Sequence, residues 1–215
     1  MKTTVCIIAL ALMLSDSSSG QQGYKKETII IRTEFGDIFA RLDLEKAPVT
    51  SSNFLRYVDA GLFDSTCFYR VVRSDNQPGD SILIEVVQGG RYEDEESVFP
   101  AIVHETTEMT GIRHRNGTIS MARYVPGTAT SEFFICVGDQ PELDFGGRRN
   151  PDRQGFAAFG EIIRGMDVVK KIHSLTAPDQ YLEDPVLILE ISRTGKHTKS
   201  NQSLPEQQTS IHFIE

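Results

Sequence analysis

The chain has 215 residues and a mass of 24.0 kDa, which suits one domain. Its 30 acidic and 22 basic side chains leave a net charge of −8, so it lacks the basic excess of proteins that bind nucleic acid by neutralising phosphates. An apolar fraction of 39% with 24% charged residues excludes both a disordered chain and a membrane-embedded one. Three cysteines are too few for a scaffold held together by disulfides.

The first twenty residues have the pattern of a secretory signal peptide. Lys2 gives a positive start, Val5–Leu14 is an uninterrupted apolar run, and small residues suited to cleavage end at Gly20. An apolar run of this length is too short to span about 30 Å of hydrocarbon as a helix. We therefore predict a signal peptide over 1–20, export to the periplasm or the extracellular space, and no stable membrane insertion. A buried N-terminal strand or helix is the alternative interpretation.

Removal of the signal peptide would leave Cys67 and Cys136 as the remaining cysteines. They could pair in an oxidising compartment, but both lie in apolar runs typical of strands, where a buried free thiol is the commoner state. We predict two free thiols.

Short β-type runs recur along the chain, many of them rich in Ile, Val and Phe. The segments with this pattern are Thr28–Thr33, Asp37–Leu42, Thr66–Arg73, Ser81–Gln88, Thr118–Arg123, Phe133–Val137, Phe156–Ile163 and Val186–Arg193. A turn containing Gly36 joins the first two, as expected for a hairpin. Short strands in this number within one domain indicate a sandwich or a closed barrel.

Two segments predict helices, which suits a barrel because its open ends need apolar covers. Pro48 fits a first helical turn, and the apolar residues after it share one face until Gly61. Residues 165–174 also have apolar residues at helical spacing, with lysines in the last turn where the helix dipole favours them. The polar, unpatterned residues 195–215 predict a disordered tail.

The sequence lacks the usual motifs of several reaction types. HExxH and CxxC motifs, which bind metals, are absent, as are a GxSxG nucleophile elbow and a glycine-rich phosphate loop. The acidic run 93–96 lacks the spacing of a calcium site and predicts a solvated loop. Asn116 begins a glycosylation sequon, but Asn-Gly is first of all a turn signal. We therefore expect no metal and no cofactor.

Five ordered motifs distinguish the chain: Phe68–Val72 (FYRVV), Gln88–Gly90 (QGG), Ser120–Arg123 (SMAR), Thr130–Ile135 (TSEFFI) and Phe156–Gly160 (FAAFG). Each is weak alone, because an arginine in a strand is usually a surface charge and paired phenylalanines are usually core. In this order and spacing, over about Thr28–Arg193, they resemble the cyclophilin-type peptidyl-prolyl cis-trans isomerases. The resemblance implies a mainly β fold, an eight-stranded closed antiparallel β-barrel capped by two α-helices, over residues 28–194. The strand count agrees with this.

The resemblance also implies a site and an activity. Arg70 is the implied catalytic residue. The implied substrate-binding residues are Gln88, Phe134, Leu143, Phe156, Val86, Ala122 and Arg123. The implied enzyme accelerates Xaa-Pro isomerisation during protein folding outside the cytoplasm and needs no cofactor or metal. Its expected partners are proline-containing peptides and unfolded protein clients, and we expect a monomer that binds no nucleic acid.

The chain departs from the family pattern near the predicted proline pocket. Residues 74–80 lengthen the connection after the arginine strand, and Glu85 stands where relatives have Phe. Because a buried unpaired carboxylate is costly, either Glu85 turns outward or a bulge shifts the register so that Ile84 fills the place. Glu132 replaces a Gln, and Glu142 stands where many relatives have Trp or Phe.

Two other functions compete with the isomerase. A peptide-binding or chaperone module on the same barrel, with weak or no turnover, is mildly favoured by the acidic substitutions. An unrelated secreted β-barrel binder would need the ordered motifs to be a coincidence. Turnover on a short Xaa-Pro peptide separates the enzyme from the binding module.

Overall fold

The structure is a computed structural model of the chain, and it describes residues 26–91 and 98–195. Its strands are β1 (Lys26–Thr33), β2 (Gly36–Asp43), β3 (Thr66–Val72), β4 (Val86–Gly90), β5 (Thr118–Met121), β6 (Phe133–Cys136), β7 (Ala157–Arg164) and β8 (Tyr181–Arg193). Its helices are α1 (Pro48–Asp59), α2 (Thr107–Thr110), α3 (Met166–His173) and the 3-10 turn η1 (Pro141–Leu143). The predicted signal peptide and all but the first residue of the predicted tail lie outside the described residues.

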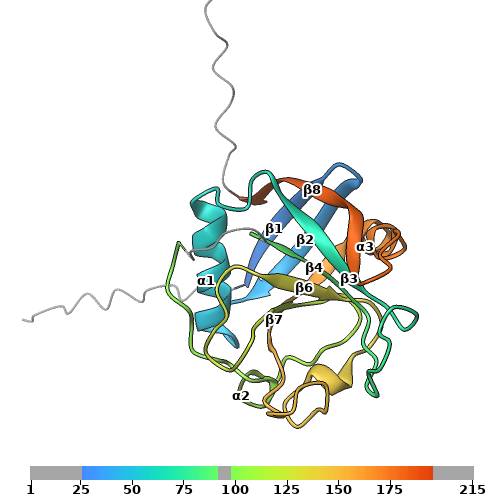
Figure 1. Ribbon diagram of the computed structural model, residues 1–215. Coiled ribbons are helices and arrows are strands. Elements are labelled where there is room, and N and C mark those ends of the chain that lie inside the picture. The colour runs from blue at the N-terminus through green and yellow to red at the C-terminus, as the bar shows by residue number, and fades with distance from the viewer. Residues whose placement is uncertain (1–25, 92–97, 196–215) are drawn as a thin grey trace, which may run out of the picture.

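The strands close into one antiparallel barrel in the order β1-β2-β7-β5-β6-β4-β3-β8 (Figure 1). The hairpin of β1 and β2 forms as predicted, and β8 closes the barrel by pairing with both β1 and β3. Closure leaves no strand of the described barrel with an unpaired edge. The predicted fold class is confirmed.

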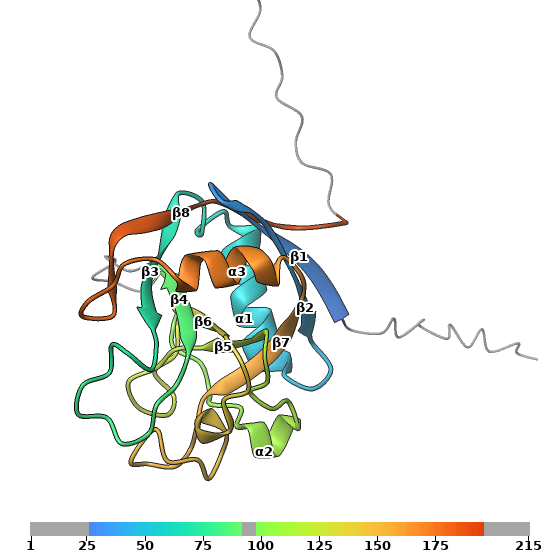
Figure 2. The same cartoon turned by 90° about the vertical axis from the view of Figure 1, so that its right-hand side faces the viewer.

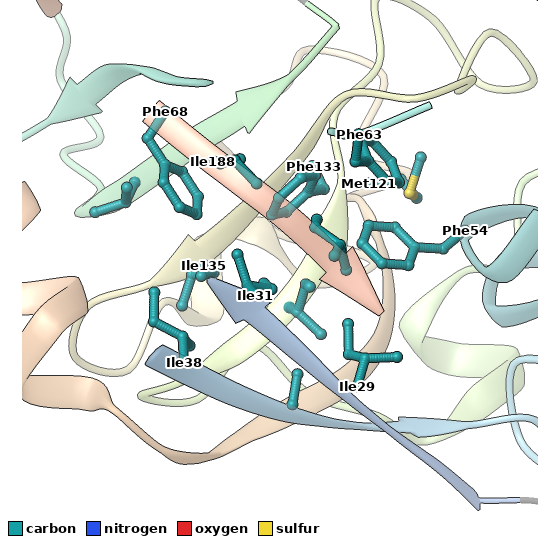
Figure 3. Packing of buried hydrophobic residues seen from close by; sticks show 14 of the residues in the cluster. Ile29, Ile31, Ile38, Phe54, Phe63, Phe68, Met121, Phe133, Ile135 and Ile188 are labelled. Atoms are coloured by element: carbon teal, nitrogen blue, oxygen red, sulfur yellow. The ribbon is translucent and has the colours of Figure 1, made fainter. Parts of the chain in front are cut away.

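Apolar side chains from opposite walls fill the interior of the barrel (Figure 3). Phenylalanine rings make up much of this packing. Phe133 meets Phe54 and Phe68 edge to face, with ring centroids 5.2 and 5.7 Å apart. Because side chains occupy the interior, we expect a ligand site on the outside of the barrel.

Helices α1 and α3 cover different sides of the barrel (Figures 1 and 2). Helix α1 packs on β2, β7 and β8, whereas α3 packs on β2, β3 and β4. The free N–H groups at the start of α1 donate to the Glu105 carboxylate, from Val49 at 3.1 Å and Thr50 at 2.7 Å, so a distant side chain caps the helix. Among the described residues no helix is long and apolar enough to cross a membrane.

The predicted strand Ser81–Gln88 is wrong in its first half, because β4 begins only at Val86. The side chain of Gln77 accounts for this. Its Nε2 donates to the carbonyl of Ile84 at 2.8 Å, and its Oε1 accepts from the Ile84 N–H at 3.3 Å. One amide side chain thus satisfies backbone groups that a neighbouring strand would otherwise bind.

Other element boundaries also differ from the prediction. Strand β8 begins at Tyr181, whereas the predicted strand began at Val186. The sequence did not reveal the first part of β8 because Glu183, Asp184 and Pro185 interrupt the apolar pattern there. Helix α2 and the turn η1 were not predicted, since segments of four and three residues are too short to show a helical period.

Cys136 on β6 is a buried free thiol, as predicted. Burial raises its pKa, because the thiolate would lose its hydration. Cys67 lies half-buried on β3 and forms no disulfide with Cys136.

Strands β4 and β6 bury both of their faces. Val87 and Phe133 point into the barrel, whereas their neighbours Val86 and Phe134 belong to a second apolar cluster. We call this second group the outer cluster. Its buried members are Val72, Ile84, Val86, Phe134, Cys136 and Leu143, and the partly buried Ala122 and Phe156 pack against it. Burial on both faces explains why β6 (FFIC) is a continuous apolar run rather than an alternating one.

Candidate active site

Arg70, Gln88 and Phe134 lie in one row across neighbouring strands. Arg70 on β3 pairs with Gln88 on β4, and Gln88 pairs with Phe134 on β6. Adjacent strands lie about 4.8 Å apart, so about 10 Å separates the backbone of the guanidinium residue from that of the phenyl residue. A polar strip therefore borders directly on the outer cluster, at a separation that a short peptide can bridge.

A β-bulge at Tyr69 places two side chains opposite Gln88. The register of β3 on β4 shifts between Phe68 and Arg70, so Tyr69 and Arg70 together face one residue. Arg70 Nη1 donates to Gln88 Oε1 at 2.8 Å, and Gln88 Nε2 donates to the Tyr69 hydroxyl at 2.6 Å. One amide thus holds both side chains.

The Tyr69 hydroxyl in turn donates to Glu132 Oε2 at 2.5 Å. Burial, followed by the charge of Glu132, raises the pKa of Tyr69, so the hydroxyl keeps the proton that it donates. Burial lowers the pKa of Arg70, but the ordinary value for arginine is so far above neutrality that the guanidinium stays charged. Glu132 therefore supports the polar strip by accepting the Tyr69 hydrogen bond.

The predicted apolar contact residues come together in the outer cluster. Val86, Phe134 and Leu143 are buried in it, and Ala122 and Phe156 pack against it with part of their surface exposed. Phe134 and Phe156 meet edge to face with centroids 5.3 Å apart. These residues form one apolar cluster next to Arg70 and Gln88, and Ala122 and Phe156 are its partly exposed members.

The structure resolves the alternative left open for Glu85. Ile84 is buried in the outer cluster, and the carbonyl of Glu85 accepts from the Val137 N–H at 2.9 Å. The isoleucine therefore supplies the apolar contact, and the Glu85 side chain, on a half-buried residue, is not a member of the cluster.

A hydrogen-bonded triad supports Phe134 from behind. His114 Nδ1 lies 2.8 Å from Asp144 Oδ1, and His114 Nε2 lies 3.0 Å from the Ser120 hydroxyl. The imidazole stacks on the Phe134 ring at 5.9 Å. Ser-His-Asp is the arrangement of nucleophilic hydrolases, but Ser120 is fully buried, so no substrate carbonyl can reach its hydroxyl. The triad positions Phe134.

Burial lowers the pKa of His114, because an imidazolium at this site would lose its hydration, and this outweighs the opposing effect of Asp144. The unfolded chain takes up this proton near pH 6.5, whereas the folded chain takes it up only at lower pH. We therefore expect the free energy of unfolding to fall as the pH drops below about 6.5, by at most about 1.4 kcal/mol per pH unit for this one proton.

This pH dependence is measurable by urea unfolding followed by circular dichroism between pH 7.5 and 5. His114→Asn keeps a donor toward Asp144 and lacks the titrating ring, so it should lower stability at neutral pH and flatten the profile. His104, whose pKa burial also lowers, is only half-buried, so His104→Asn should flatten it less. An unchanged slope in His114→Asn would contradict the assignment.

Arg123, a predicted substrate contact, has its side-chain donors engaged within the protein. Its Nη1 and Nη2 donate to the two carboxylate oxygens of Asp152 at 2.7 and 2.9 Å, and its Nε and Nη2 donate to the carbonyl of Gly155 at 2.8 and 2.6 Å. The guanidinium also lies 5.2 Å from the centre of the Phe156 ring. The side chain braces the loop before Phe156, which leaves the backbone of Arg123 as the group that can meet a ligand.

Glu142 is half-buried and paired with Arg148, whose Nη2 lies 2.8 Å from Glu142 Oε1. The hydrogen bonds from Arg148 lower the pKa of this carboxyl. The charge of the acidic substitutions noted in the sequence is therefore partly neutralised by partners that the sequence did not reveal.

Sequence reasoning missed the partners that hold the site together. Gln180, which accepts from Arg70 Nη2, and Asp152 both lie far along the chain from the residues they bind. No local motif marks such contacts. The described residues also form a pocket of about 420 Å³ away from this row, and none of the predicted site residues lines it; it is bordered by Leu44, Ser52, Leu55, Arg56, Asp59, Ala60, Phe99 and Arg193.

No group of three or more His, Cys, Asp or Glu side chains in residues 26–91 and 98–195 is placed to hold a metal ion.

Comparison with known proteins gives a consistent result. Residues 28–193 match the family described as cyclophilin type peptidyl-prolyl cis-trans isomerase/CLD. The chain is 34% identical over 175 residues to peptidyl-prolyl cis-trans isomerase A of Dickeya dadantii (strain 3937), which covers 80% of this chain and 84% of that protein. It is 34% identical over 148 residues to peptidyl-prolyl cis-trans isomerase B of Escherichia coli (strain K12), covering 67% and 82%.

A crystal structure of a cyclophilin type isomerase from Cryptosporidium parvum has the same fold, with a TM-score of 0.65 and 21% identity over 80% of this chain and 99% of that one. The Cryptosporidium protein has also been solved in the presence of the dipeptide Ala-Pro. The match over residues 28–193 and the identity to the bacterial enzymes show that this chain belongs to the cyclophilin-type peptidyl-prolyl cis-trans isomerase family.

Proposed function

We propose that the chain carries out the isomerase reaction of its family at the row of Arg70, Gln88 and Phe134, on proline-containing segments of proteins that fold outside the cytoplasm. One observation carries the placement of the site: a charged guanidinium held by an amide lies beside an apolar surface, on neighbouring strands. This juxtaposition suits a reaction in which a polar group acts on the nitrogen of an apolar ring.

The chemistry demands little more than this. An Xaa-Pro bond has cis and trans forms of similar energy, separated by a barrier of about 18–20 kcal/mol that comes from amide conjugation. Reaching a turnover of ~10³ s⁻¹ requires lowering that barrier by about 7 kcal/mol. No covalent bond has to form or break, so neither a nucleophile nor a general base is needed.

Arg70 can favour the twisted state over the planar one. When the bond rotates out of plane, conjugation is lost and the prolyl nitrogen becomes pyramidal with a localised lone pair. A guanidinium N–H can donate to this lone pair but gains little from the planar nitrogen, which makes the contact specific for the transition state. A charge-assisted hydrogen bond contributes about 1.5–3 kcal/mol, so Arg70 supplies only part of the effect.

The remaining stabilisation would come from the surface beside it. Phe134, Leu143 and Phe156 would hold the prolyl ring and exclude water from an amide whose planar form has the larger dipole. Gln88 and the backbone at Ala122 and Arg123 would hold the flanking chain while the other side of the bond rotates. The reaction as proposed uses no metal and no cofactor.

A peptide-binding module with weak or no turnover is the alternative. Arg70 makes no ion pair with a carboxylate among the described residues, so its charge is available to a ligand, as the proposed reaction requires.

The deciding experiment is exchange spectroscopy on a short peptide that contains Ala-Pro. NMR is the suitable method because the chain has no Trp to report binding by fluorescence. Uncatalysed cis–trans exchange takes tens to hundreds of seconds. We expect catalytic amounts of the protein to make this exchange much faster. Peptide binding that shifts resonances without faster exchange would support the binding module and contradict the enzyme.

Export is the second part of the proposal, and residues 1–20 support it by their composition. Expression of the full sequence in a bacterium, followed by fractionation and mass measurement, is the test. We expect the protein outside the cytoplasm with a mass reduced by the leader. An intact mass in the cytoplasmic fraction would overturn this part alone.

We propose further that the protein acts as a monomer.

A further inference from the structure

Gln180 holds Arg70 from the side opposite Gln88. Arg70 Nη1 donates to Gln88 Oε1, and Arg70 Nη2 donates to Gln180 Oε1. Gln180 precedes β8, and its carbonyl accepts the Val71 N–H at 2.8 Å, next to Arg70 in the chain. Two amide oxygens from different parts of the fold therefore flank the guanidinium, one at each terminal nitrogen.

Gln180 is itself anchored on the insertion that the sequence singled out, residues 74–80. Gln180 Nε2 donates to the carbonyl of Asn76 at 3.2 Å. Asn76 is buried, and its Nδ2 donates to the carbonyls of Val71 at 3.1 Å and Ala177 at 2.9 Å. The insertion is thus fixed to the strand of Arg70 and to the segment before Gln180.

These contacts orient the Gln180 amide in one direction. Its nitrogen needs an acceptor, which is the Asn76 carbonyl, and its oxygen is left to accept from Arg70. The backbone of Gln180 lies in the left-handed region, with φ of 72°. Glycine is the usual residue in that region, because a Cβ makes it unfavourable. A glutamine there is consistent with a side chain that is needed in its place.

We propose that Gln180 is a positioning residue for Arg70, anchored by the 74–80 insertion through Asn76. Because hydrogen bonds hold both terminal nitrogens, the plane of the guanidinium is fixed. Its Nε–H and its remaining Nη–H groups then point in a constant direction, from which they can donate to the substrate. A misdirected donor weakens transition-state stabilisation far more than ground-state binding. The inference rests on the proposed function of Arg70.

The test compares three single variants. Gln180→Gly removes the side chain and its two hydrogen bonds, but glycine suits the left-handed backbone and offsets part of that loss, so the variant should stay folded. We expect kcat on the Ala-Pro peptide to fall about tenfold with KM changed less than about twofold. Ser65→Gly is the matched control, because Ser65 is an exposed residue with φ of 62°, outside the site. It should leave both constants unchanged. Arg70→Ala is the third variant and should lose most of the activity.

A double-mutant cycle separates positioning from other roles. In an Arg70→Ala background, Gln180→Gly should have no further effect, because the residue acts through Arg70. The NMR signals of the Arg70 guanidinium, assigned by their absence in Arg70→Lys, should show restricted rotation in the parent and faster averaging in Gln180→Gly.

Each outcome is decisive. A rise in KM at constant kcat in Gln180→Gly would mean that Gln180 binds peptide directly and would overturn the inference, as would unchanged guanidinium signals. If Arg70→Ala loses activity while Gln180→Gly keeps it, only the positioning role falls. If Arg70→Ala keeps full activity, the proposed role of Arg70 itself falls, and the inference with it.

Discussion

Arg70→Ala is expected to lower kcat/KM for Xaa-Pro isomerisation about a hundredfold while the protein stays folded. The substitution removes one charge-assisted hydrogen bond of about 1.5–3 kcal/mol, and each 1.36 kcal/mol corresponds to about a factor of ten in rate. The fold should survive because Arg70 is not part of the apolar cluster that fills the barrel, and Gln88 keeps its second partner, Tyr69. Exchange spectroscopy on the Ala-Pro peptide measures the rate.

Arg70→Lys provides the control for charge. Lysine keeps the positive charge but offers a point donor instead of a planar fork, so it cannot bind Gln88, Gln180 and the prolyl nitrogen together. We expect it to restore only a small part of the activity. Equal kcat/KM for Arg70→Ala and the parent, with matching circular dichroism melts, would refute the proposed mechanism.

Phe134→Ala is expected to lower the free energy of unfolding by about 3–5 kcal/mol and to raise KM at least about tenfold. The decrease in stability follows from the 3% exposed ring, which packs against Phe156 and His114. The KM effect follows if the same ring forms the surface that holds proline. Urea unfolding and peptide kinetics measure the two effects separately.

Phe133→Ala is the matched control, because the same residue type at the preceding position of β6 points into the barrel. It should cost comparable stability yet leave KM close to that of the parent. The milder pair Phe133→Leu and Phe134→Leu repeats the comparison in proteins that retain more of their stability. A KM that rises equally in both members of a pair would show that reduced stability, not removal of a proline contact, causes the effect.

The barrel was predictable because its signals are local. Short apolar runs separated by turn residues mark the strands, and Pro48 and Gly61 bracket α1 closely. The resemblance carried by the ordered motifs singled out Arg70, Gln88 and Phe134. They lie in one row because each sits within a strand whose pairing the fold determines.

Polar interactions between distant segments were missed, because local patterns do not carry them. The apolar residues before Val86 look like a strand, but the amide of Gln77 satisfies the Ile84 backbone instead. The amide of Gln180 and the carboxylate of Asp152 reach the site from distant loops. Such polar interactions depend on tertiary geometry that no sequence period encodes.

In β4 and β6, alternate side chains serve two different roles, packing of the barrel and contact with ligand. Because successive side chains point to opposite sides, Phe133 and Val87 determine how the barrel packs, while Phe134 and Val86 belong to the surface that is proposed to meet ligand. Substitutions at every second residue of these strands can therefore change which peptides bind. The intervening residues can stay the same and preserve the packing of the barrel. Adjacent codons in this gene segment are accordingly expected to experience different selective pressures.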